Sequence, residues 1–407
     1  MTLPERQTSL LEVRLGKPAH GGYCVARHDG RVVFVRGGLP GELVQVRITE
    51  DRGRFCRAEV VDVAEPSPHR VPAVCPAAAA GAGCCDLAHA TVAAQREFKA
   101  SVLVEQLQRL AGLDMPVELR ALPGSADGTR WRTRVRLAVD ADGRAGVHRY
   151  RSEEILGELS CPQPVPGTVD GIAGRRWRPG SQLQLAVDAT GERQIVELSA
   201  TRRHGGRGRG DVRRQRLLDG ADRAREHVRD RVFEISAGGF WQAHRGAAQA
   251  YAEVVADWAA LRTGEHAWDL YSGVGVFAAQ LADQVGESGA VVAVESVAAA
   301  VHDGQRALAD LPQVKFRSGR VERVLAELRH APRVVVLDPP RAGAGRAVVE
   351  AITAREPARI IHIGCDPASF ARDVGLYRAA GYRLESVTAF DAFPLTHHME
   401  AIGLLVR

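Results

Sequence analysis

The sequence lacks the long apolar segments that membrane-spanning and exported proteins carry. No run approaches the roughly 18 consecutive apolar residues of a membrane helix, and the segment Met1–Ser9 contains no signal-peptide core. We therefore expect a cytoplasmic protein that makes no membrane contact. Nothing in the chain indicates an obligate protein partner.

Lysine is scarce as well. Only three of the 54 basic residues are lysines, and the other 51 are arginines. Arginine suits contacts with nucleic-acid phosphates and stacking on bases, although a GC-rich genome produces the same bias. The formal net charge of +5 is modest, so composition alone leaves both explanations open.

Disulfide bonds are not expected either, because a cytoplasmic compartment keeps thiols reduced. The seven cysteines must then serve metal ligation, catalysis or packing. Cys24 and Cys56 lie within strand-like runs near the start of the chain, and we interpret them as packing residues. At 407 residues the chain is too long for one ordinary core, which predicts about two or three domains.

Residues 1–64 are predicted to form a small five-stranded barrel. Asp29-Gly30 separates two alternating apolar runs, which is a strong hairpin signal. The expected strands are Leu11–Leu15, Tyr23–His28, Arg31–Val35, Glu42–Ile48 and Arg54–Val63. The turn His20–Gly22 and the segments Gly30–Val35 and Leu39–Glu42 resemble the TRAM domain, an OB-like barrel that binds RNA in RNA-modifying enzymes. The resemblance implies an RNA-binding barrel, and a barrel that serves only as a scaffold is the alternative.

Residues 65–235 are predicted to form a central α+β domain. A helix is expected from Thr91 to Leu110, ended by Gly112, and it packs either within this domain or on the C-terminal one. Strand-like runs follow at Arg134–Val139 and Gln194–Ser199. The stretch Arg202–Arg216 holds seven arginines, four glycines and one acid, which predicts a mobile loop. Binding of RNA phosphates and simple solvation are equally good explanations for it.

Residues 236–407 are predicted to form an α/β domain with a doubly wound, Rossmann-like parallel sheet. From Gly264 onward, strand-like and helical segments alternate, which is typical of this fold. The expected strands are His266–Leu270, Val291–Glu295, Val314–Ser318, Arg333–Leu337 and Ile360–Ile363. Ligands of such sheets bind outside the carboxyl ends of the strands, so residues just after each strand are the candidates.

A glycine-rich loop follows the first of these strands, and an acid ends the second. Gly273 and Gly275 allow a tight turn and a close approach of the backbone to a ligand, while Glu295 is placed to bind ribose hydroxyls. This pattern suits a nicotinamide cofactor, and hence an oxidoreductase, or S-adenosylmethionine. Three further features favour the methyl donor: Ala278 where a nicotinamide fingerprint has a third glycine, the leading acid Asp269, and the rigid turn Asp338-Pro339-Pro340-Arg341.

Cys365 differs from the other cysteines in its surroundings. It follows the last parallel strand, in Gly364-Cys365-Asp366-Pro367, and precedes a helix whose dipole favours a thiolate. A buried free cysteine is the alternative. The segment Phe393–Glu400 then ends in a carboxylate just before a final strand, Ala401–Val406. The pair His397-His398 either orients Glu400 or is solvated.

The glycine loop, the Asp338–Arg341 turn, the cysteine segment and the Phe393–Glu400 segment resemble the RNA 5-methyluridine methyltransferases. Together with the barrel, the resemblance covers nearly the whole chain, and it implies S-adenosylmethionine-dependent methylation of carbon 5 of a uridine in RNA. Cys365 matches the nucleophile that attacks carbon 6 of uracil, and Glu400 matches the base that removes the carbon 5 proton. The matching S-adenosylmethionine ligands are Gln242, Tyr271, Glu295 and Asp338, beside the loop glycines Gly273 and Gly275.

Two positions depart from the family's pattern. The family often has Ser-Cys-Asn-Pro where this chain has Gly364-Cys365-Asp366-Pro367, which removes a serine and an amide next to the thiol. Some members have asparagine where Val276 stands. A non-catalytic RNA-binding protein on the same scaffold is a further hypothesis, and the presence of both Cys365 and Glu400 counts against it.

Four cysteines outside the barrel and the Cys365 segment resemble the ligands of a 4Fe–4S cluster in the bacterial 23S rRNA members of the family: Cys75, Cys84, Cys85 and Cys161. The family separates the second and third ligands by two residues, whereas here they are adjacent, so zinc or free thiols are the alternatives. A cluster would be structural, because methyl transfer needs no electrons. The classical members that act on the T-loop uridine of tRNA lack the barrel and the cluster. The resemblance therefore favours 23S rRNA, with tRNA as the alternative substrate.

Overall fold

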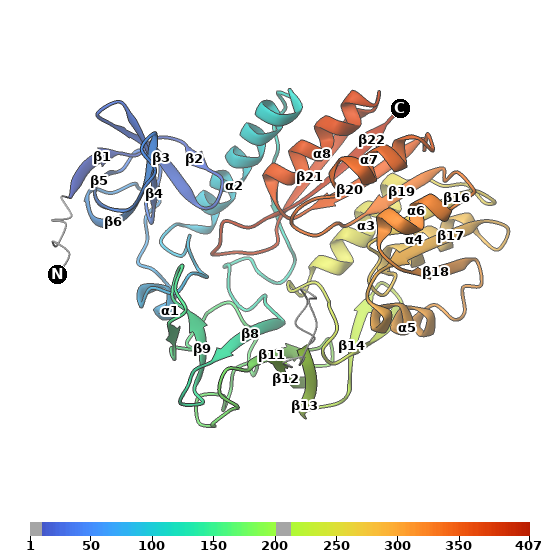
Figure 1. The fold of residues 1–407 in the computed structure, drawn as a ribbon, viewed down its shortest axis with the longest axis horizontal. Coiled ribbons are helices and arrows are strands. Elements are labelled where there is room, and N and C mark those ends of the chain that lie inside the picture. The colour runs from blue at the N-terminus through green and yellow to red at the C-terminus, as the bar shows by residue number, and fades with distance from the viewer. Residues whose placement is uncertain (1–9, 201–212) are drawn as a thin grey trace, which may run out of the picture.

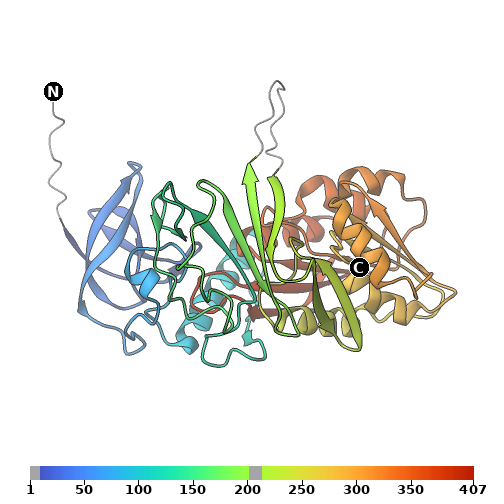
Figure 2. The ribbon, with the colours of Figure 1, turned by 90° about the horizontal axis from the view of Figure 1, so that it is seen from below.

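The computed structural model describes residues 10–200 and 213–407, which form three large sheets with their associated helices (Figure 1). Seen from below, the N-terminal barrel, a central antiparallel sheet and a mixed sheet covered by helices follow one another along the molecule (Figure 2). Among the described residues, no helix is long and apolar enough to cross a membrane. The sheets do not divide the chain into consecutive segments, and the boundaries at residues 64 and 235 stay a proposal.

The barrel contains six strands in the order β1-β5-β6-β4-β3-β2. Asp29 and Gly30 both have positive φ and form the predicted two-residue hairpin turn. Backbone hydrogen bonds from Gly16 to Val25 and from Val25 to Lys17 bring β3 back to the start of the barrel. Cys24 and Cys56 lie in its apolar core. The strands are β1 Leu11–Arg14, β2 Pro18–Ala19, β3 Tyr23–His28, β4 Arg31–Arg36, β5 Leu43–Asp51 and β6 Phe55–Glu65.

The central sheet is antiparallel, with the order β10-β9-β8-β11-β12-β13. Its first part lies beside the short helix α1, Pro76–Ala79. Of the predicted arginine-rich loop, residues 202–212 lie outside the described residues. Residues 213–216 belong to β13, so the prediction of a loop is wrong for them: their backbone pairs with β12 while the side chains of residues 214–216 are exposed. The strands are β8 Arg134–Val139, β9 Ala145–His148, β10 Ile155–Leu156, β11 Gln182–Val187, β12 Arg193–Ala200 and β13 Arg213–Asp219.

The mixed sheet has eight strands in the order β18-β17-β16-β19-β20-β22-β21-β7. The five predicted parallel strands are confirmed, and the antiparallel strand β22 lies beside β20. The sequence analysis missed β21 and the edge strand β7, which comes from far earlier in the chain. The strands are β7 Leu119–Ala121, β16 His266–Leu270, β17 Ala290–Glu295, β18 Val314–Ser318, β19 Val334–Leu337, β20 Arg359–Gly364, β21 Arg383–Asp391 and β22 Glu400–Val406.

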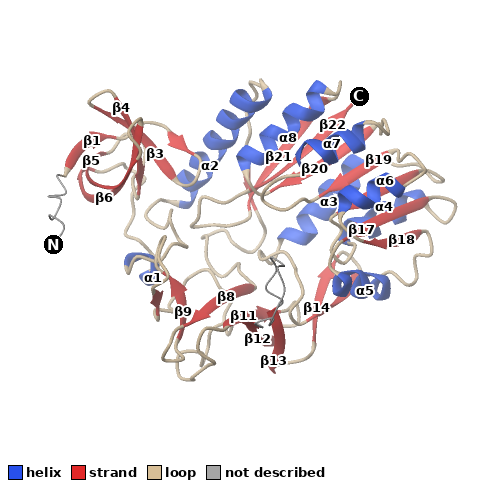
Figure 3. Ribbon diagram, in the orientation of Figure 1, coloured by secondary structure: helices blue, strands red, loops and turns tan. Residues whose placement is uncertain are grey.

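Helices cover both faces of the mixed sheet (Figure 3). Successive residues of a strand point to opposite faces, and the all-apolar strand β19 therefore contributes to two separate cores. This is the doubly wound α/β fold that the sequence predicted. One face carries α3 Ala247–Ala259, α4 Val276–Val285 and α5 Ala298–Ala307, and the other carries α6 Val321–Glu327, α7 Gly345–Thr353 and α8 Pro367–Ala379.

Helix α2, Val92–Gln106, joins the barrel to the mixed sheet. Thr91 caps it by accepting a hydrogen bond from the Ala94 amide at 3.4 Å, and a π-helical turn, η1 Leu107–Ala111, ends at Gly112 with φ 63°. The predicted helix is thus confirmed. Phe98 and Val102 pack in the barrel core, whereas Leu103 and Leu107 pack under the mixed sheet. The hairpin of β14 Arg223–Val228 and β15 Arg231–Ser236 also packs on the helices of that sheet.

Candidate active site

A cavity of about 940 Å³ opens at the carboxyl ends of β16, β17, β19 and β20. This is the edge at which ligands of doubly wound sheets bind. All but one of the predicted catalytic and cofactor-binding residues line it: Gln242, Tyr271, Gly273, Glu295, Asp338, Cys365 and Glu400. Gly275 is the exception, and it is the residue that precedes α4.

The glycine loop after β16 owes its shape to left-handed backbone conformations. Tyr271, Gly273 and Gly275 have φ of 59°, 54° and 84°. A side chain on Gly275 would place its Cβ 2.8 Å from the ring of Phe316, whereas a Cβ on Gly273 would meet no atom within 4 Å. Gly275 is therefore needed for close packing below the loop, and Gly273 for the turn and the open space above it.

Asp269 stabilises the start of α4 rather than facing the cavity. Its Oδ2 accepts a hydrogen bond from the Ala278 amide at 2.8 Å, and its side chain is completely buried. Burial raises the pKa of this carboxyl well above its usual range. The acid that led the predicted cofactor motif thus fixes the helix on which the glycine loop rests.

Glu295 and Asp338 face the cavity from neighbouring regions of the sheet. Glu295 ends β17 and accepts hydrogen bonds from the amides of Gly273 at 3.1 Å and Val297 at 2.7 Å. Asp338 follows β19 and accepts one from the Gln242 side chain at 3.2 Å. Burial raises the pKa of Asp338 to about 7. Both acids are held in place before any ligand binds.

Cys365 and Glu400 lie next to each other because β20 and β22 pair antiparallel. Gly364 is in register with Ala401, so the next pair of positions along the two strands is Cys365 and Glu400. Glu400 is only 2% exposed, and its Oε1 has no hydrogen-bond partner within the described part of the chain. Burial and the neighbouring Asp338 raise the pKa of Glu400 well above its usual range. A buried acceptor without a partner, lining a cavity, is suited to a group on a bound substrate.

The environment of Cys365 differs from the sequence expectation. Burial, together with Glu400 and Asp338, raises the pKa of the thiol to about 12, and only Arg341 opposes this. Burial and the neighbouring acids thus disfavour the thiolate that the helix dipole was expected to favour. The adjacent glycine has a packing reason, since a Cβ on Gly364 would lie 3.0 Å from Phe370.

The loop that leads to Glu400 is held by α2, which the sequence analysis did not foresee. Lys99 on α2 forms an ion pair of 2.5 Å with Asp391 and donates to the carbonyl of Phe393 at 3.1 Å. Both charged side chains are buried. The amide of Leu395, whose φ is 67°, donates to the Gln95 side chain at 2.8 Å. A lysine on the apolar face of a predicted helix, in a chain with only three lysines, is a sequence signal that could have identified Lys99 as a buried charged residue.

The histidine pair before Glu400 has other partners than the carboxylate. Asp86 accepts hydrogen bonds from the backbone amide of His397 at 3.0 Å and from its ring nitrogen Nδ1. His398 Nδ1 lies 3.2 Å from a guanidinium nitrogen of Arg341. These contacts fix the loop that carries Glu400, and Asp86 was not among the predicted site residues. Elsewhere, His362 is a core residue and His302 is exposed.

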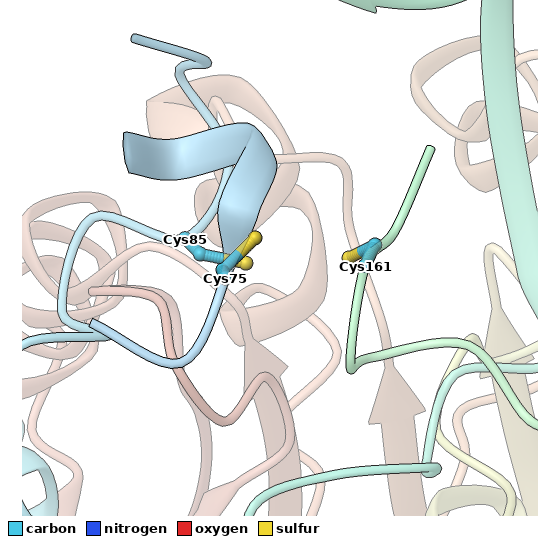
Figure 4. A group of neighbouring side chains, drawn as sticks. All are labelled: Cys75, Cys85 and Cys161. Carbon is cyan, nitrogen blue, oxygen red and sulfur yellow. The ribbon is translucent and has the colours of Figure 1, made fainter. Parts of the chain in front are cut away.

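Three of the four predicted metal ligands converge beside strands β9 and β10 of the central sheet. The sulfur atoms of Cys75, Cys85 and Cys161 lie within 4.8 Å of one another and point toward a common space (Figure 4). Cys84 is outside this group, but its thiol interacts with those of Cys75 and Cys85. The charge of Arg132 is near enough to Cys84, Cys85 and Cys161 to interact with them electrostatically. The arrangement can hold a thiolate-ligated metal or cluster.

Comparison with known proteins agrees with this geometry. The model of the TRAM domain matches residues 5–61, and the model of the tRNA (Uracil-5-)-methyltransferase family matches residues 215–407. The chain is 43% identical to an uncharacterized RNA methyltransferase of Corynebacterium glutamicum, over 98% of this chain and 97% of that protein. It is 29% identical to the 23S rRNA (uracil(1939)-C(5))-methyltransferase RlmD of Shewanella piezotolerans, over 98% and 96%.

A solved structure has the same fold over nearly the whole length. It is the Pyrococcus abyssi tRNA (uracil-54, C5)-methyltransferase in complex with S-adenosyl-L-homocysteine, at 21% identity and a TM-score of 0.69, covering 97% of this chain and 99% of that one. These similarities exclude the nicotinamide-dependent alternative. The protein belongs to the S-adenosylmethionine-dependent RNA uracil-5-methyltransferases, with a TRAM domain at its N-terminal end.

Proposed function

We propose that the protein methylates carbon 5 of a uridine in 23S rRNA through a covalent bond between Cys365 and carbon 6 of the uracil. The observation that carries this proposal is the pairing of β20 and β22, which places Cys365 and Glu400 side by side at the cavity. The unpartnered Oε1 of Glu400 supports its role as the base. Because the target atom lies within the base, the uridine must enter from a single strand or flip out of a helix.

The thiol is needed because carbon 5 of uracil is a poor nucleophile. Addition of the Cys365 sulfur to carbon 6 produces an enolate with electron density at carbon 5. Bound S-adenosylmethionine supplies the methyl group that this carbon takes up. The thiol must lose its proton on or before attack, since its pKa is about 12 in the free protein. The Arg341 charge favours that loss.

Glu400 would complete the reaction by removing the proton from carbon 5. The carbon–sulfur bond then breaks with its electron pair on sulfur, so that the Cys365 thiolate and the methylated uridine separate while Glu400 holds the proton. The raised pKa of Glu400 makes its carboxylate a stronger base than an exposed one. Gln242, Tyr271, Gly273, Glu295 and Asp338 are the residues that would hold S-adenosylmethionine, because they line the same cavity.

Two substitutions test the catalytic roles. Cys365→Ala is expected to abolish methyl transfer. Glu400→Gln is expected to accumulate a covalent protein–RNA adduct, visible as a slower band on a denaturing gel, because the carbon 5 proton cannot leave. Glu385→Gln, an exposed glutamate on β21, is the matched control and should form no such band. A Glu400→Gln protein that neither methylates nor forms an adduct would count against the assignment of the base.

The choice of RNA rests on the full-length similarity to the 23S rRNA enzyme. The barrel favours neither RNA, because the solved tRNA enzyme matches 97% of this chain, which includes the barrel. The T-loop uridine of tRNA is the second candidate, because the solved structure with the same fold acts on uracil 54 of tRNA. Deleting the gene and mapping 5-methyluridine in both RNAs decides between them. Loss from 23S rRNA alone supports the proposal, loss from tRNA alone replaces it with the second candidate, and loss from neither overturns it.

The converging cysteines are proposed to hold a 4Fe–4S cluster, with Cys75, Cys85 and Cys161 as ligands and Cys84 as the fourth. Arg132 supports this, because its charge would offset part of the negative charge of a thiolate-ligated cluster. The cluster would tie the segment around α1 to the loop of Cys161. Protein purified without oxygen should be brown, with broad visible absorption and bound iron and sulfide. Cys161→Ser should lose the visible absorption and the bound iron and sulfide, whereas Cys56→Ser should keep them. Zinc in place of iron would refute the cluster.

A further inference from the structure

The barrel turn His20–Gly22 lies against the two loops that carry Cys365 and Glu400. His20 Nε2 is 2.8 Å from Oδ2 of Asp366, the residue that follows the thiol. A small cavity between the turn and the loops is lined by His20, Gly22, Arg341, Cys365, Asp366 and His397. A loop of the barrel thus contacts the residue next to Cys365 and lines a cavity together with Cys365 and the Glu400 loop.

On the thiol side, Asp366 is fixed by one local contact and one long-range contact. Its Oδ1 accepts a hydrogen bond from the Ser369 amide at 2.9 Å and caps α8, while its Oδ2 faces His20. Burial alone would raise the pKa of Asp366, but the hydrogen bonds from His20 and Ser369 outweigh it and lower that pKa. The carboxylate is therefore ionised, and the imidazole must be the donor in this pair.

On the base side, the contact is made by the backbone of Gly22. Its φ is +80°, and an added Cβ would lie 2.6 Å from Oδ2 of Asp86 and 3.2 Å from Cβ of His397. Asp86 in turn holds His397, three residues before Glu400. Only a glycine gives the turn both this conformation and this close approach.

We infer that the turn His20–Gly22 is a positioning element for the methyl-transfer reaction. It holds the Cys365 loop through Asp366 and the Glu400 loop through the Asp86–His397 pair. This inference rests on the proposed roles of Cys365 and Glu400. Misplacement of a reacting group by about 1 Å can lower a rate by about 100-fold, so loosening the turn should lower kcat more than it raises KM for RNA.

The first test removes the imidazole. His20→Ala should lower kcat about tenfold, which corresponds to one charge-assisted hydrogen bond, and leave KM for RNA within about twofold. The substrate is RNA from a strain that lacks the gene, with tritiated S-adenosylmethionine. The matched control is His28→Ala, at another histidine of the barrel. Within the described part of the chain, the ion-pair partner of His28 is its neighbour Asp29. A normal kcat for His20→Ala, or a change in KM alone, overturns the inference.

The second test uses the aspartate. Asp366→Asn keeps an oxygen for the Ser369 amide and places an amide NH2 opposite His20, whose Nε2 can accept in the other neutral tautomer, so it should retain more activity than Asp366→Ala. Asp366→Ala removes both contacts and should lose at least as much as His20→Ala. The double substitution of His20 and Asp366 by alanine should be no worse than Asp366→Ala alone, because both changes remove the same contact. Additive losses would contradict the inference.

The third test compares two glycines of the barrel. Gly22→Ala combines backbone strain with the clash against Asp86, whereas Gly53→Ala, with φ +74° and no atom within 4 Å of its Cβ, has the strain alone. Gly22→Ala should therefore lower kcat and Gly53→Ala should not. Melting curves of both proteins show whether Gly22→Ala has lost its fold, and the two tests above do not depend on it. Equal kcat values for the two folded variants would contradict the inference.

A final measurement separates failure of this inference from failure of the proposed function. The rate at which iodoacetamide alkylates Cys365 in protein without RNA, followed by mass spectrometry of its peptide, should rise in His20→Ala and stay unchanged in His28→Ala. This readout needs no methyl transfer. If Cys365→Ala still methylates RNA, the proposed function is wrong. If Cys365→Ala is inactive while the His20→Ala protein keeps its kcat and its alkylation rate, only the positioning role is wrong.

Discussion

The two halves of the candidate site are built in different ways. The half that would hold S-adenosylmethionine comes from strand–loop–helix units whose groups have partners within 96 positions of the sequence, from Asp269 with the amide of Ala278 to Asp338 with Gln242. The half with Glu400 depends on partners about 300 residues away, Lys99 and Asp86. The difference indicates that the proposed cofactor site depends mainly on the mixed sheet, whereas placement of Glu400, the proposed base, also requires contacts with α2 and with the segment that contains Asp86.

The largest effect is expected where the base half depends on a buried ion pair. Lys99→Ala would leave the buried carboxylate of Asp391 without its cation, which should lower the free energy of unfolding by about 3–5 kcal/mol. Lys17→Ala removes a pair with Glu105 in which Lys17 is 67% exposed, so it should change stability by at most about 1 kcal/mol. Chemical denaturation measures the free energy of unfolding of both variants. Similar losses of stability in the two would refute the claim that Lys99 supports the Glu400 loop.

The glycine loop allows a matched comparison within the cofactor half. Gly275→Ala combines a left-handed backbone with a clash against Phe316, and it should lower stability by about 2–3 kcal/mol. Gly273→Ala has the backbone strain alone, about 1 kcal/mol. Thermal midpoints with and without S-adenosylhomocysteine distinguish the two. A larger loss at Gly273 would show that packing under the loop is not what requires Gly275.

A smaller effect is expected from pH, through Asp338. Its pKa is raised to about 7, so its carboxyl is mostly neutral at pH 6 and mostly ionised at pH 8. A ligand with a positively charged amino group prefers the ionised form, so S-adenosylhomocysteine should bind up to about tenfold more tightly at pH 8 than at pH 6. Calorimetric titration of the protein with S-adenosylhomocysteine at the two pH values measures this difference in affinity. Asp338→Asn should remove the dependence, while Asp257→Asn on the exposed side of α3 should keep it.

The smallest effect is expected at Asp269. Because burial raises its pKa, a neutral amide should replace the carboxyl with little change, and Asp269→Asn should lose less than about 1 kcal/mol of stability. Asp269→Ala removes the acceptor of the Ala278 amide and should lose about 1–2 kcal/mol. Melting curves of the two variants show whether Asp269→Ala loses more stability than Asp269→Asn. A severe loss in Asp269→Asn would mean that the negative charge itself is needed.

Much of the mixed sheet could be predicted because its signals are local. The apolar strands β16–β20, the glycine loop and the thiol segment are each contiguous in sequence, and the parallel arrangement brings their ends to one cavity. The edge strand β7 has only three residues and escaped the pattern analysis. The analysis also missed β21, although it pairs with β22, the next strand in the sequence. The resemblance of four cysteines to cluster ligands indicated a metal site but did not show which three sulfurs converge.

The sequence by itself determined the TRAM-like barrel and the doubly wound sheet, and it supplied the residue types that the proposed thiol-dependent methyl transfer needs. These features could be recognised because periodic patterns and short motifs consist of residues that are close together in the sequence. Only the tertiary structure decided that Cys365 and Glu400 adjoin through the register of β20 and β22. It also decided that Lys99, Asp86 and His20 support their loops. Those contacts join residues up to 346 positions apart, and their energy comes from burial and charge pairing that exist only once the chain has folded.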